Sequence, residues 1–487
     1  MTTTVTARTT LLCTLYCELV NDALADISYD ASHSGLMYNF TNHIRGLLID
    51  VSGYNDKLDV LLEKVVLQVR GLEVSEDRFK IIRDRMLRYL RNSEYAHPFN
   101  QVGTYSEQFE GEKSVTNDEL LPELENVTAQ NVQQFFPQIL AQCHIEVLAH
   151  GNLYNEEALK ITDLVGRAIK PRRLPANQVP TRRGLIWPFG SNFIYEKQFK
   201  DPRNINHCIE YSLYTGHRYD SVMRAKLLLF GHMTNEPCFN ELRTIEQLGY
   251  VVFSGPSLDD VWSGYCILIQ SEKDCRYLKG RIENFLNMFE QKLNDMSEED
   301  FERHKRAMIN NRMAKLENLS SGDSVFWNHI YSDSYGFLQA DVDAETLEKL
   351  TKKDMAKAKE PSLGKNKTAA AAVLNITADD EASQTRVEGV SSKKAISDAI
   401  AGHLTDDLKV EEEVADKVLD EAKAELGIAD SGLSAPPQAL NASTDVKEVV
   451  DASHPVLIEN VHFWKASMQV SSDVRLERDL EEIVEVA

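Results

Sequence analysis

An internal repeat constrains the fold of this 487-residue chain more than any other sequence feature. Over residues 32–90 a helix ends at a glycine, two strand-like runs and an amphipathic helix follow, and a second helix opens at a serine. The same order returns over residues 249–313. The paired landmarks lie 214, 218 and 222 residues apart and are Gly35 with Gly249, Gly46 with Gly264, and Ser75 with Ser297. Small differences in loop length between two copies of one domain produce such a gradual increase in spacing, so the sequence predicts two related domains.

The composition of the repeated elements predicts an α+β fold. The strand-like runs are rich in Val, Ile, Leu and Tyr, and the helices carry apolar residues on one face. In the first helix that face consists of Leu12, Leu15, Leu19, Ala23 and Ile27. Strands recur in pairs without intervening helices, which favours two homologous domains, each with a mostly antiparallel sheet and helices packed on one face.

Later segments close the first copy and open the second. A strand is predicted over HIEVLAHGN (144–152), followed by a helix over 155–170 and a linker with three prolines and several arginines over 170–184. The second copy then opens with strands near 194–199 and 207–214, and its helix after the strand pair covers about 274–293. The predicted divisions are 1–175 (first domain), 176–192 (linker), 193–380 (second domain), 381–452 (acidic low-complexity linker) and 453–487 (a C-terminal segment that docks back).

Composition and charge exclude several function classes. The formal net charge of −23 argues against binding to nucleic acids or anionic membranes, and no apolar run reaches the roughly 20 residues that cross a bilayer. Seven scattered cysteines, without a C-x-x-C pair, are typical of reduced core residues, and no secretory signal is expected. We therefore expect a cytoplasmic protein, with an organellar location left open.

The common catalytic motifs are absent from the sequence. It contains no H-E-x-x-H, no H-x-x-E-H, no phosphate-binding loop and no G-x-S-x-G. His144 and His150 share one face of the predicted strand, but without a carboxylate at ligand spacing they favour a structural role over metal binding. The pair Cys13 and Cys17 is typical of core packing, and the acidic run 411–413 is typical of a solvated helix face.

The segment CFNELRTIEQLGYVVFSG (238–255) joins a charged helix directly to a strand. The residues around Pro237 predict a helix start there, with the proline at or near the first position. Gly249 suits a left-handed cap at the end of this helix, and Tyr250 is then the first residue of the strand.

Arg243 and Tyr250 lie seven residues apart across this junction, and local chemistry leaves two interpretations open. In one, Arg243 pairs with a nearby acid such as Glu246 or Glu236, and Tyr250 is an ordinary strand aromatic. In the other, both side chains donate to one carbonyl or oxyanion, which needs two donors about 2.7–3.1 Å from one point. The residues alone favour the first interpretation.

At this segment the sequence resembles a known family. EPCFNELRTIEQLGYVVFSG, followed by IQSEK, closely resembles the C-terminal half of the insulysin-type M16 zinc metallopeptidases, which include insulin-degrading enzymes and fungal pheromone-processing relatives. GLMYNF followed by VSGYNDK resembles their middle, or third, domain, and 193–380 resembles the fourth, also described as a PQQ-synthesis-peptidase-like C-terminal lobe. The resemblance covers roughly 8–380 and, weakly, 453–487.

The resemblance implies four homologous α+β domains in two bowl-shaped halves that enclose a chamber for unfolded peptides. The zinc, its ligands and the catalytic Glu of such enzymes belong to the first domain, and no segment of this sequence resembles that domain. We therefore expect no cofactor in this chain and zinc in an implied N-terminal half. The first domain is expected to be trimmed at its N-terminal side, which leaves unpaired strand edges that aggregate unless another chain covers them.

The resemblance also implies roles for three residues. Arg243 and Tyr250 match residues that reach across the chamber to the scissile peptide and help to stabilise the tetrahedral intermediate, and Phe239 matches a chamber-lining aromatic that contacts substrate. The implied reaction is metal-assisted peptide hydrolysis, in which a Glu of the other half acts as base and Tyr250 donates to the developing oxyanion.

Two functional hypotheses follow from the resemblance. The chain is either the substrate-binding half of an insulysin-like metallopeptidase, inactive alone, or a peptide-binding scaffold without catalysis. The expected partners are peptide substrates and either a zinc-bearing N-terminal half or further copies of this chain. Retention of both Arg243 and Tyr250 favours the first hypothesis, because a scaffold without catalysis has no need of both residues.

Overall fold

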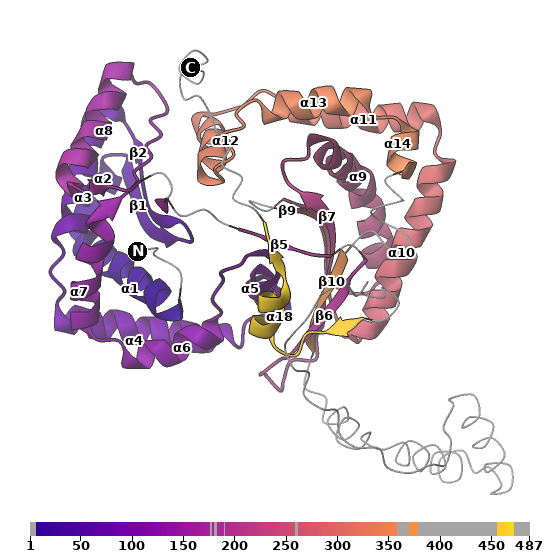
Figure 1. Cartoon of the computed structure of the whole chain (residues 1–487), viewed down its shortest axis with the longest axis horizontal. Helices are drawn as coiled ribbons and strands as arrows, with labels where there is room; N and C mark the ends of the chain where they lie inside the picture. The colour runs from indigo at the N-terminus through magenta and orange to yellow at the C-terminus, as the bar shows by residue number, and fades with distance from the viewer. Residues whose placement is uncertain are drawn as a thin grey trace, which may run out of the picture. The chain divides into compact units, whose positions relative to one another are not determined.

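The computed structural model describes residues 6–175, 178–179, 183–188, 190–258, 262–357, 370–377 and 455–471 (Figure 1). The chain divides into two compact units, of which the larger holds 1–199, 206–377 and 451–487. The smaller unit consists of 200–205 and 378–450. The predicted acidic linker at 381–452, with its run 411–413, therefore lies outside the described residues.

The first copy begins with two consecutive helices and a hairpin. Its elements are α1 (Ala7–Ala23), α2 (Ala25–His33), β1 (Leu36–His43), β2 (Gly46–Gly53), the short 3-10 helix η1 (Asn55–Lys57), α3 (Leu58–Gly71), α4 (Glu76–Ser93), α5 (Pro98–Glu110), α6 (Asn117–Asn126), α7 (Ala129–Leu140), β3 (Gln142–Cys143), α8 (Asn155–Ile169) and β4 (Arg172–Arg173). The strand pair predicted after Gly35 and Gly46 is confirmed, and Gly35 has the left-handed φ of 71° that its helix exit requires.

The core of the first copy forms where α1, β1 and α7 meet. Tyr16 is fully buried and stacks on Phe136, with ring centroids 4.8 Å apart, and it meets Phe40 edge-on at 5.8 Å. Cys13 and Cys17 are buried in the same cluster, which confirms the prediction that they are core residues. Burial raises the pKa of the Cys13 thiol to about 12, so this thiol stays protonated at neutral pH.

The strand predicted over 144–152 is absent. Only Gln142 and Cys143 form a short strand, and residues 144–150 belong to neither a helix nor a strand. The apolar side chains that alternate along this segment remain solvent-accessible, with Ile145 and Val147 each 37% exposed. A strand exists only where a neighbour completes its backbone hydrogen bonds, and no strand of the described chain occupies the space beside this segment.

The second copy contains a larger sheet. Its elements are β5 (Leu185–Ile186), β6 (Asn192–Gln198), β7 (His207–His217), α9 (Ser221–Phe239), the π-helical η3 (Asn240–Ile245), β8 (Val251–Leu258), β9 (Trp262–Ser271), α10 (Cys275–Asp295), α11 (Glu298–Arg312), α12 (Leu319–Tyr331), α13 (Gln339–Lys349), α14 (Lys352–Lys357), β10 (Ala370–Thr377), β11 (Val456–Leu457), α18 (Val461–Ser467) and β12 (Gln469–Val470). The helix predicted to open at Ser297 does so, and the Ser297 hydroxyl accepts from the backbone N–H of Asp300 at 3.0 Å.

Six strands form one sheet in the order β11-β6-β10-β7-β9-β8. The pairs β10–β7, β7–β9 and β9–β8 are antiparallel, whereas β6 is parallel to β10 and to β11. Helices α9 and α10 cover one face, where Ile209, Tyr211 and Leu213 of β7 are buried against them (Figure 1). The predicted fold class, α+β with mostly antiparallel pairing, is confirmed.

The other face of this sheet is covered by a helix of the first copy and by the C-terminal segment. Helix α5 of the first copy contacts β7, β9 and β10, and the backbone N–H of Phe99 donates to the Gln270 side chain at 3.1 Å. Trp464 of α18 lies 5.2 Å from the ring of Phe109 and 5.3 Å from that of Phe193. The described part of the C-terminal segment, 455–471, thus packs on the sheet.

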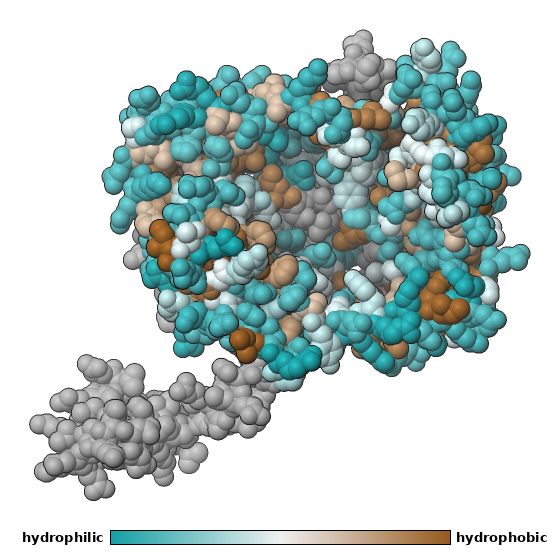
Figure 2. Space-filling view, turned by 180° about the vertical axis from the view of Figure 1, so that it is seen from behind, coloured by the Kyte–Doolittle hydropathy of each residue, from teal (hydrophilic) through white to brown (hydrophobic). Residues whose placement is uncertain are grey.

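The surface carries no large apolar face in the view that Figure 2 gives. Hydrophilic residues dominate that face, and hydrophobic residues gather in small separate groups. Among the helices that the structure describes, none combines the length and the apolar content needed to cross a bilayer.

Candidate functional site

The candidate site lies where α9 passes through η3 into β8. Pro237 does not start a helix, contrary to the sequence prediction, because α9 begins at Ser221 and contains this proline near its end. The Asp220 side chain caps α9 by accepting from the N–H groups of Val222 and Met223. The Asp220 cap therefore marks the helix start, and the proline falls near the end of α9, where the helix widens into the π-helical turn.

The exit from this turn also differs from the prediction. Gln247, with a φ of 52°, takes the left-handed position that was assigned to Gly249. Gly249 is needed for another reason, since a Cβ atom there would lie 1.9 Å from the carbonyl oxygen of Gln270. The absence of a side chain lets the backbone approach β9 closely, and β8 then begins at Val251, one residue after Tyr250.

Arg243 is held between two aromatic rings. Its guanidinium carbon lies 4.9 Å from the centroid of Phe239 and 5.1 Å from that of Tyr250, both within cation–π range. Its Nε donates to the backbone carbonyl of Tyr250 at 3.1 Å. Three contacts thus fix one cation at the junction, and the structure brings together all three residues that the sequence singled out.

One of the two acids predicted as partners of Arg243 binds another residue. Glu246 accepts from Nε of Arg281 at 2.7 Å and forms a second contact with the same guanidinium. This bidentate pair raises the pKa of Arg281 and connects η3 to α10. The guanidinium of Arg243 is directed instead towards the two rings and the Tyr250 carbonyl.

The aromatic side chains at this site face solvent. Tyr250 is 86% exposed and Phe239 is 44% exposed, whereas the neighbouring Leu242 and Leu248 are buried in the core. The buried leucines anchor the backbone of the turn. Beside them, the exposed Tyr250 phenol and Phe239 ring flank the Arg243 guanidinium. A fixed cation beside an exposed phenol can donate hydrogen bonds to a peptide carbonyl or to an anion.

The histidines discussed from the sequence do not form a metal site. His144 lies 2.9 Å from the Glu146 carboxylate, and His150 meets the ring of Phe326 edge-on at 5.5 Å. Across the described ranges, no three His, Cys, Asp or Glu side chains lie close enough together to hold a metal ion.

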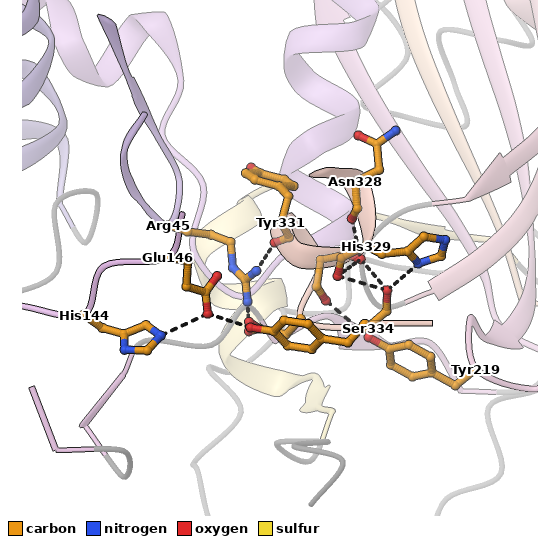
Figure 3. Close-up of polar contacts among 11 residues, drawn as sticks. Arg45, His144, Glu146, Tyr219, Asn328, His329, Tyr331 and Ser334 are labelled. Atoms are coloured by element: carbon orange, nitrogen blue, oxygen red, sulfur yellow. Dashed lines mark hydrogen bonds and ion pairs between the residues drawn. The ribbon is translucent and has the colours of Figure 1, made fainter. Parts of the chain in front are cut away.

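A second polar cluster, which sequence reasoning missed, joins the β1–β2 hairpin to the turn after α12 (Figure 3). Arg45 pairs with Asp333 and donates to the Tyr331 carbonyl, and Glu146 accepts from the Tyr335 hydroxyl at 2.5 Å. Asp333 and Tyr335 both have positive φ values, so this turn is held in an uncommon backbone conformation. Its partners are hundreds of residues apart in sequence, and no local motif marks them.

Comparison with known families assigns the class of this chain. Residues 1–123 match the middle or third domain of peptidase M16, and residues 229–327 match the C-terminal lobe domain 4 of PQQ synthase PqqF-like proteins. The second match contains the whole candidate site. Over these two segments the chain is similar to the peptidase M16 family.

Its curated relatives include peptidases from yeast and mammals. The chain is 37% identical over 347 residues to the A-factor-processing enzyme of Saccharomyces cerevisiae and 35% identical over 347 residues to the insulin-degrading enzyme of Homo sapiens. These matches cover 71% and 70% of this chain but only 34% of each relative. The chain therefore spans about a third of the length of the curated relatives it matches.

Solved structures agree with this fold. The crystal structure of pitrilysin superposes with a TM-score of 0.70 at 17% identity, covering 96% of this chain and 42% of that protein. A structure described as a peptidase M16 inactive domain from Pseudomonas fluorescens has a TM-score of 0.56 at 13% identity and covers 77% of this chain and 89% of that protein. At these identities the similarity establishes the fold alone.

Proposed function

We propose that this chain is the substrate-binding half of an insulysin-like zinc metalloendopeptidase and acts together with a polypeptide that carries the zinc site. The observation that carries the proposal is the exposed phenol of Tyr250 beside the guanidinium of Arg243. Glu246, one of the acids predicted to pair with Arg243, is bound to Arg281 instead. In this proposal the exposed Tyr250 hydroxyl and the outer N–H groups of Arg243 donate to a bound peptide.

Each residue has a defined task in this proposal. Arg243 binds the carbonyl groups of an extended peptide through its outer N–H groups, because its Nε is already used by the Tyr250 carbonyl. The Tyr250 hydroxyl donates to the scissile carbonyl oxygen as negative charge develops on it, which lowers the barrier to hydrolysis. Phe239 offers apolar surface to a neighbouring side chain of the peptide and keeps Arg243 in place.

Zinc belongs to the partner polypeptide in this proposal. The described residues of this chain offer no cluster of metal ligands, so no step of the reaction is assigned to a metal bound here. The peptide substrates are suggested by the relatives, which are described as processing A-factor and degrading insulin. Because the chain spans a third of those relatives, peptide hydrolysis by a complete enzyme is part of the proposal.

The test reconstitutes the two halves. The partner is the part of the Saccharomyces cerevisiae A-factor-processing enzyme that precedes its match with this chain, supplied with zinc and a quenched fluorogenic peptide. We expect the mixture to cleave faster than the partner alone. Tyr250→Phe should lower kcat/KM of the mixture about 100-fold, as loss of one oxyanion donor does. Tyr89→Phe, on an exposed tyrosine of α4, is the matched control and should leave kcat/KM unchanged.

A peptide-binding scaffold is the second candidate, because the exposed Phe239 and Tyr250 side chains can contact a peptide without any catalysis. A scaffold binds peptides in the absence of a zinc-bearing partner and adds no cleavage to a mixture. Activity of the mixture no greater than that of the partner alone, together with retained peptide binding by this chain, would select the scaffold. If the mixture with Tyr250→Phe cleaved the peptide as fast as the mixture with the parent chain, Tyr250 would have no role in stabilising the oxyanion.

A further inference from the structure

The turn between η3 and β8 sets how Arg243 and Tyr250 lie relative to each other. Arg243 belongs to the π-helical η3 and Tyr250 directly precedes β8, so residues 246–249 determine the spacing of the two side chains. A backbone hydrogen bond closes this turn, in which the N–H of Leu248 donates to the carbonyl of Leu242 at 3.0 Å. Any shift of the turn therefore moves the two proposed donors apart or together.

One residue of this turn has a backbone conformation that its residue type does not favour. Gln247 has a φ of 52°, in the left-handed region where a non-glycine residue costs free energy, and its side chain is exposed to solvent. Such a conformation persists only when the surrounding structure holds it in place. The contacts that fix the turn must therefore come from the residues on either side of Gln247.

Both neighbours of Gln247 are anchored by side chains of other elements. The Leu248 carbonyl accepts from the hydroxyl of Ser271, the last residue of β9, which is 2% exposed. On the other side, the Glu246 carboxylate uses both of its oxygens on the guanidinium of Arg281 in α10, with Nε and Oε2 2.7 Å apart. The turn is thus held between the end of a strand and a helix.

The geometry of the pair Glu246–Arg281 suits orientation more than stability. The Glu246 side chain is 13% exposed and that of Arg281 is 33% exposed, so the pair is largely withdrawn from water. Desolvation of two charges offsets much of their attraction, which makes such a pair a weak source of stability. Two parallel N–H···O bonds do fix direction, because the forked guanidinium meets both carboxylate oxygens at once. The pair therefore favours one orientation of the turn.

The pair also decides which cation binds the Glu246 carboxylate. Glu246 follows Arg243 by three residues, and side chains at this spacing are close neighbours on a helical turn. Arg281 takes both oxygens of the carboxylate, and the Arg243 guanidinium lies between the rings of Phe239 and Tyr250 instead. Loss of Arg281 would leave this carboxylate without its partner, and its attraction would draw the Arg243 guanidinium away from the rings.

We propose that Glu246 and Arg281 are positioning residues that keep the Arg243 guanidinium directed at the peptide, an inference that rests on the proposed function. Arg281 binds the carboxylate of Glu246, which fixes the turn and keeps that carboxylate from Arg243. Arg243 then offers its outer N–H groups to the carbonyls of an extended peptide at a constant distance from the Tyr250 hydroxyl. Neither positioning residue needs to touch the substrate.

Steady-state cleavage by the reconstituted mixture tests the pair through its asymmetry. Arg281→Gln frees the carboxylate and should raise KM about tenfold with little change in kcat, because Arg243 binds the peptide before and during the reaction. Adding Glu246→Gln to that variant removes the competing carboxylate and should return KM to within about threefold of the parent. A double variant with a higher KM than Arg281→Gln, or a loss confined to kcat, would overturn the proposal.

A second ion pair on the same helix provides the matched control. Lys279 and Glu283 pair at 3.9 Å on α10, and Lys279→Gln should leave KM unchanged. Arg281→Lys keeps the charge without the fork and should raise KM less than Arg281→Gln does, and it takes the place of Arg281→Gln if that variant fails to fold. An equal rise of KM in Lys279→Gln and in the Arg281 variant would contradict a role specific to the pair.

Nuclear magnetic resonance on this chain alone separates the inference from the proposed function. The Nε–H of Arg243 donates to the Tyr250 carbonyl at 3.1 Å, so its signal in ¹⁵N-arginine-labelled protein reports this contact, and Arg243→Lys identifies the signal. We expect Arg281→Gln to shift the signal, the double variant to restore it, and Lys279→Gln to leave it unchanged. An unchanged signal in Arg281→Gln would overturn the positioning role. The expected shifts without cleavage by any mixture would refute the proposed function and leave the positioning of Arg243 standing.

Discussion

Arg243 owes its position to contacts that the sequence alone does not show. The rings of Phe239 and Tyr250 lie on either side of its guanidinium, and the Tyr250 carbonyl accepts from its Nε. Planar guanidinium groups stack on rings and donate in fixed directions, which a lysine ammonium cannot reproduce. This position therefore requires the planar shape of the Arg243 guanidinium as well as its positive charge.

Arg243→Lys should accordingly weaken the reconstituted enzyme although the charge is conserved. Loss of the Nε hydrogen bond and of the stacking contacts costs about 1–2 kcal/mol of positioning, which corresponds to roughly a tenfold loss in kcat/KM. The measurement is steady-state cleavage of the fluorogenic peptide by the mixture. Arg88→Lys, on an exposed arginine of α4, serves as the control, and equal activity of both variants would contradict a positioning role.

Glu210 is the residue whose ionisation should change stability near neutral pH. It lies on β7 in the sheet face that α5 covers and accepts from the Ser212 hydroxyl at 3.1 Å. Burial raises the pKa of Glu210 to about 7. The folded state therefore holds this proton over a pH range in which the unfolded chain has lost it, and the free energy of unfolding falls as the pH rises from about 4.5 through 7.

Glu210→Gln should remove this pH dependence. The amide keeps an oxygen for Ser212 and carries no charge, so the variant should exceed the parent in free energy of unfolding by about 3 kcal/mol at pH 8.5 and by much less at pH 5. Urea unfolding across this range provides the measurement. Glu73→Gln, on an exposed residue, should follow the parent curve. A constant difference between Glu210→Gln and the parent at all pH values would contradict the assignment.

At the scale of single elements, local patterns predicted helices better than they predicted junctions. The serine at 297 caps its helix as expected because that signal needs only neighbouring residues. The helix start predicted at Pro237 was wrong, because α9 begins at the Asp220 cap and continues through the proline. The segment 144–152 has the alternation of a strand but lacks a partner, and pairing is not encoded in the segment itself.

At Gly249 the sequence likewise predicted the residue type without its structural reason. Its need for glycine was predicted, but the reason is the approach of the Gln270 carbonyl and not a left-handed φ. Gly249→Ala should lower the free energy of unfolding by about 2–3 kcal/mol, because β8 must move away from β9 to admit the methyl group. Urea denaturation measures this change.

Gly255→Ala is the matched control for that experiment. Gly255 lies in the same strand, and a Cβ atom there would meet nothing within 4 Å. Its replacement should change the free energy of unfolding by less than about 1 kcal/mol. If the two alanine variants unfolded at the same urea concentration, the close approach at Gly249 would not be the reason for the glycine.

At the scale of the whole molecule, one apolar cluster ties distant parts of the larger unit together. It contains Val102 and Phe109 of α5, Trp187, Phe193 and Tyr214 near or in the second sheet, and Trp464 of α18. The internal repeat predicted two similar domains, and it gave no sign that a helix of the first copy covers the sheet of the second. That arrangement depends on which surfaces remain apolar after each copy has folded, and local sequence patterns do not record it.

Trp464→Ala should test this connection. The indole is 8% exposed, and its removal should lower the free energy of unfolding by about 3–5 kcal/mol through lost burial and the cavity that remains. Phe463→Ala removes a neighbouring ring on the same helix that is 79% exposed, and it should have little effect. Comparable losses in both variants would mean that α18 does not anchor on the sheet through Trp464.

The packing of α5 on a sheet completed much later in the chain has a consequence for biosynthesis. The helix ends at Glu110, and β10, which it contacts, begins 260 residues further on. At translation rates of about 5–20 residues per second, α5 waits roughly 13–50 s on the ribosome before its binding surface is complete. We expect its apolar face to bind chaperones during that interval, and slowing synthesis between the two elements should increase aggregation of the nascent chain.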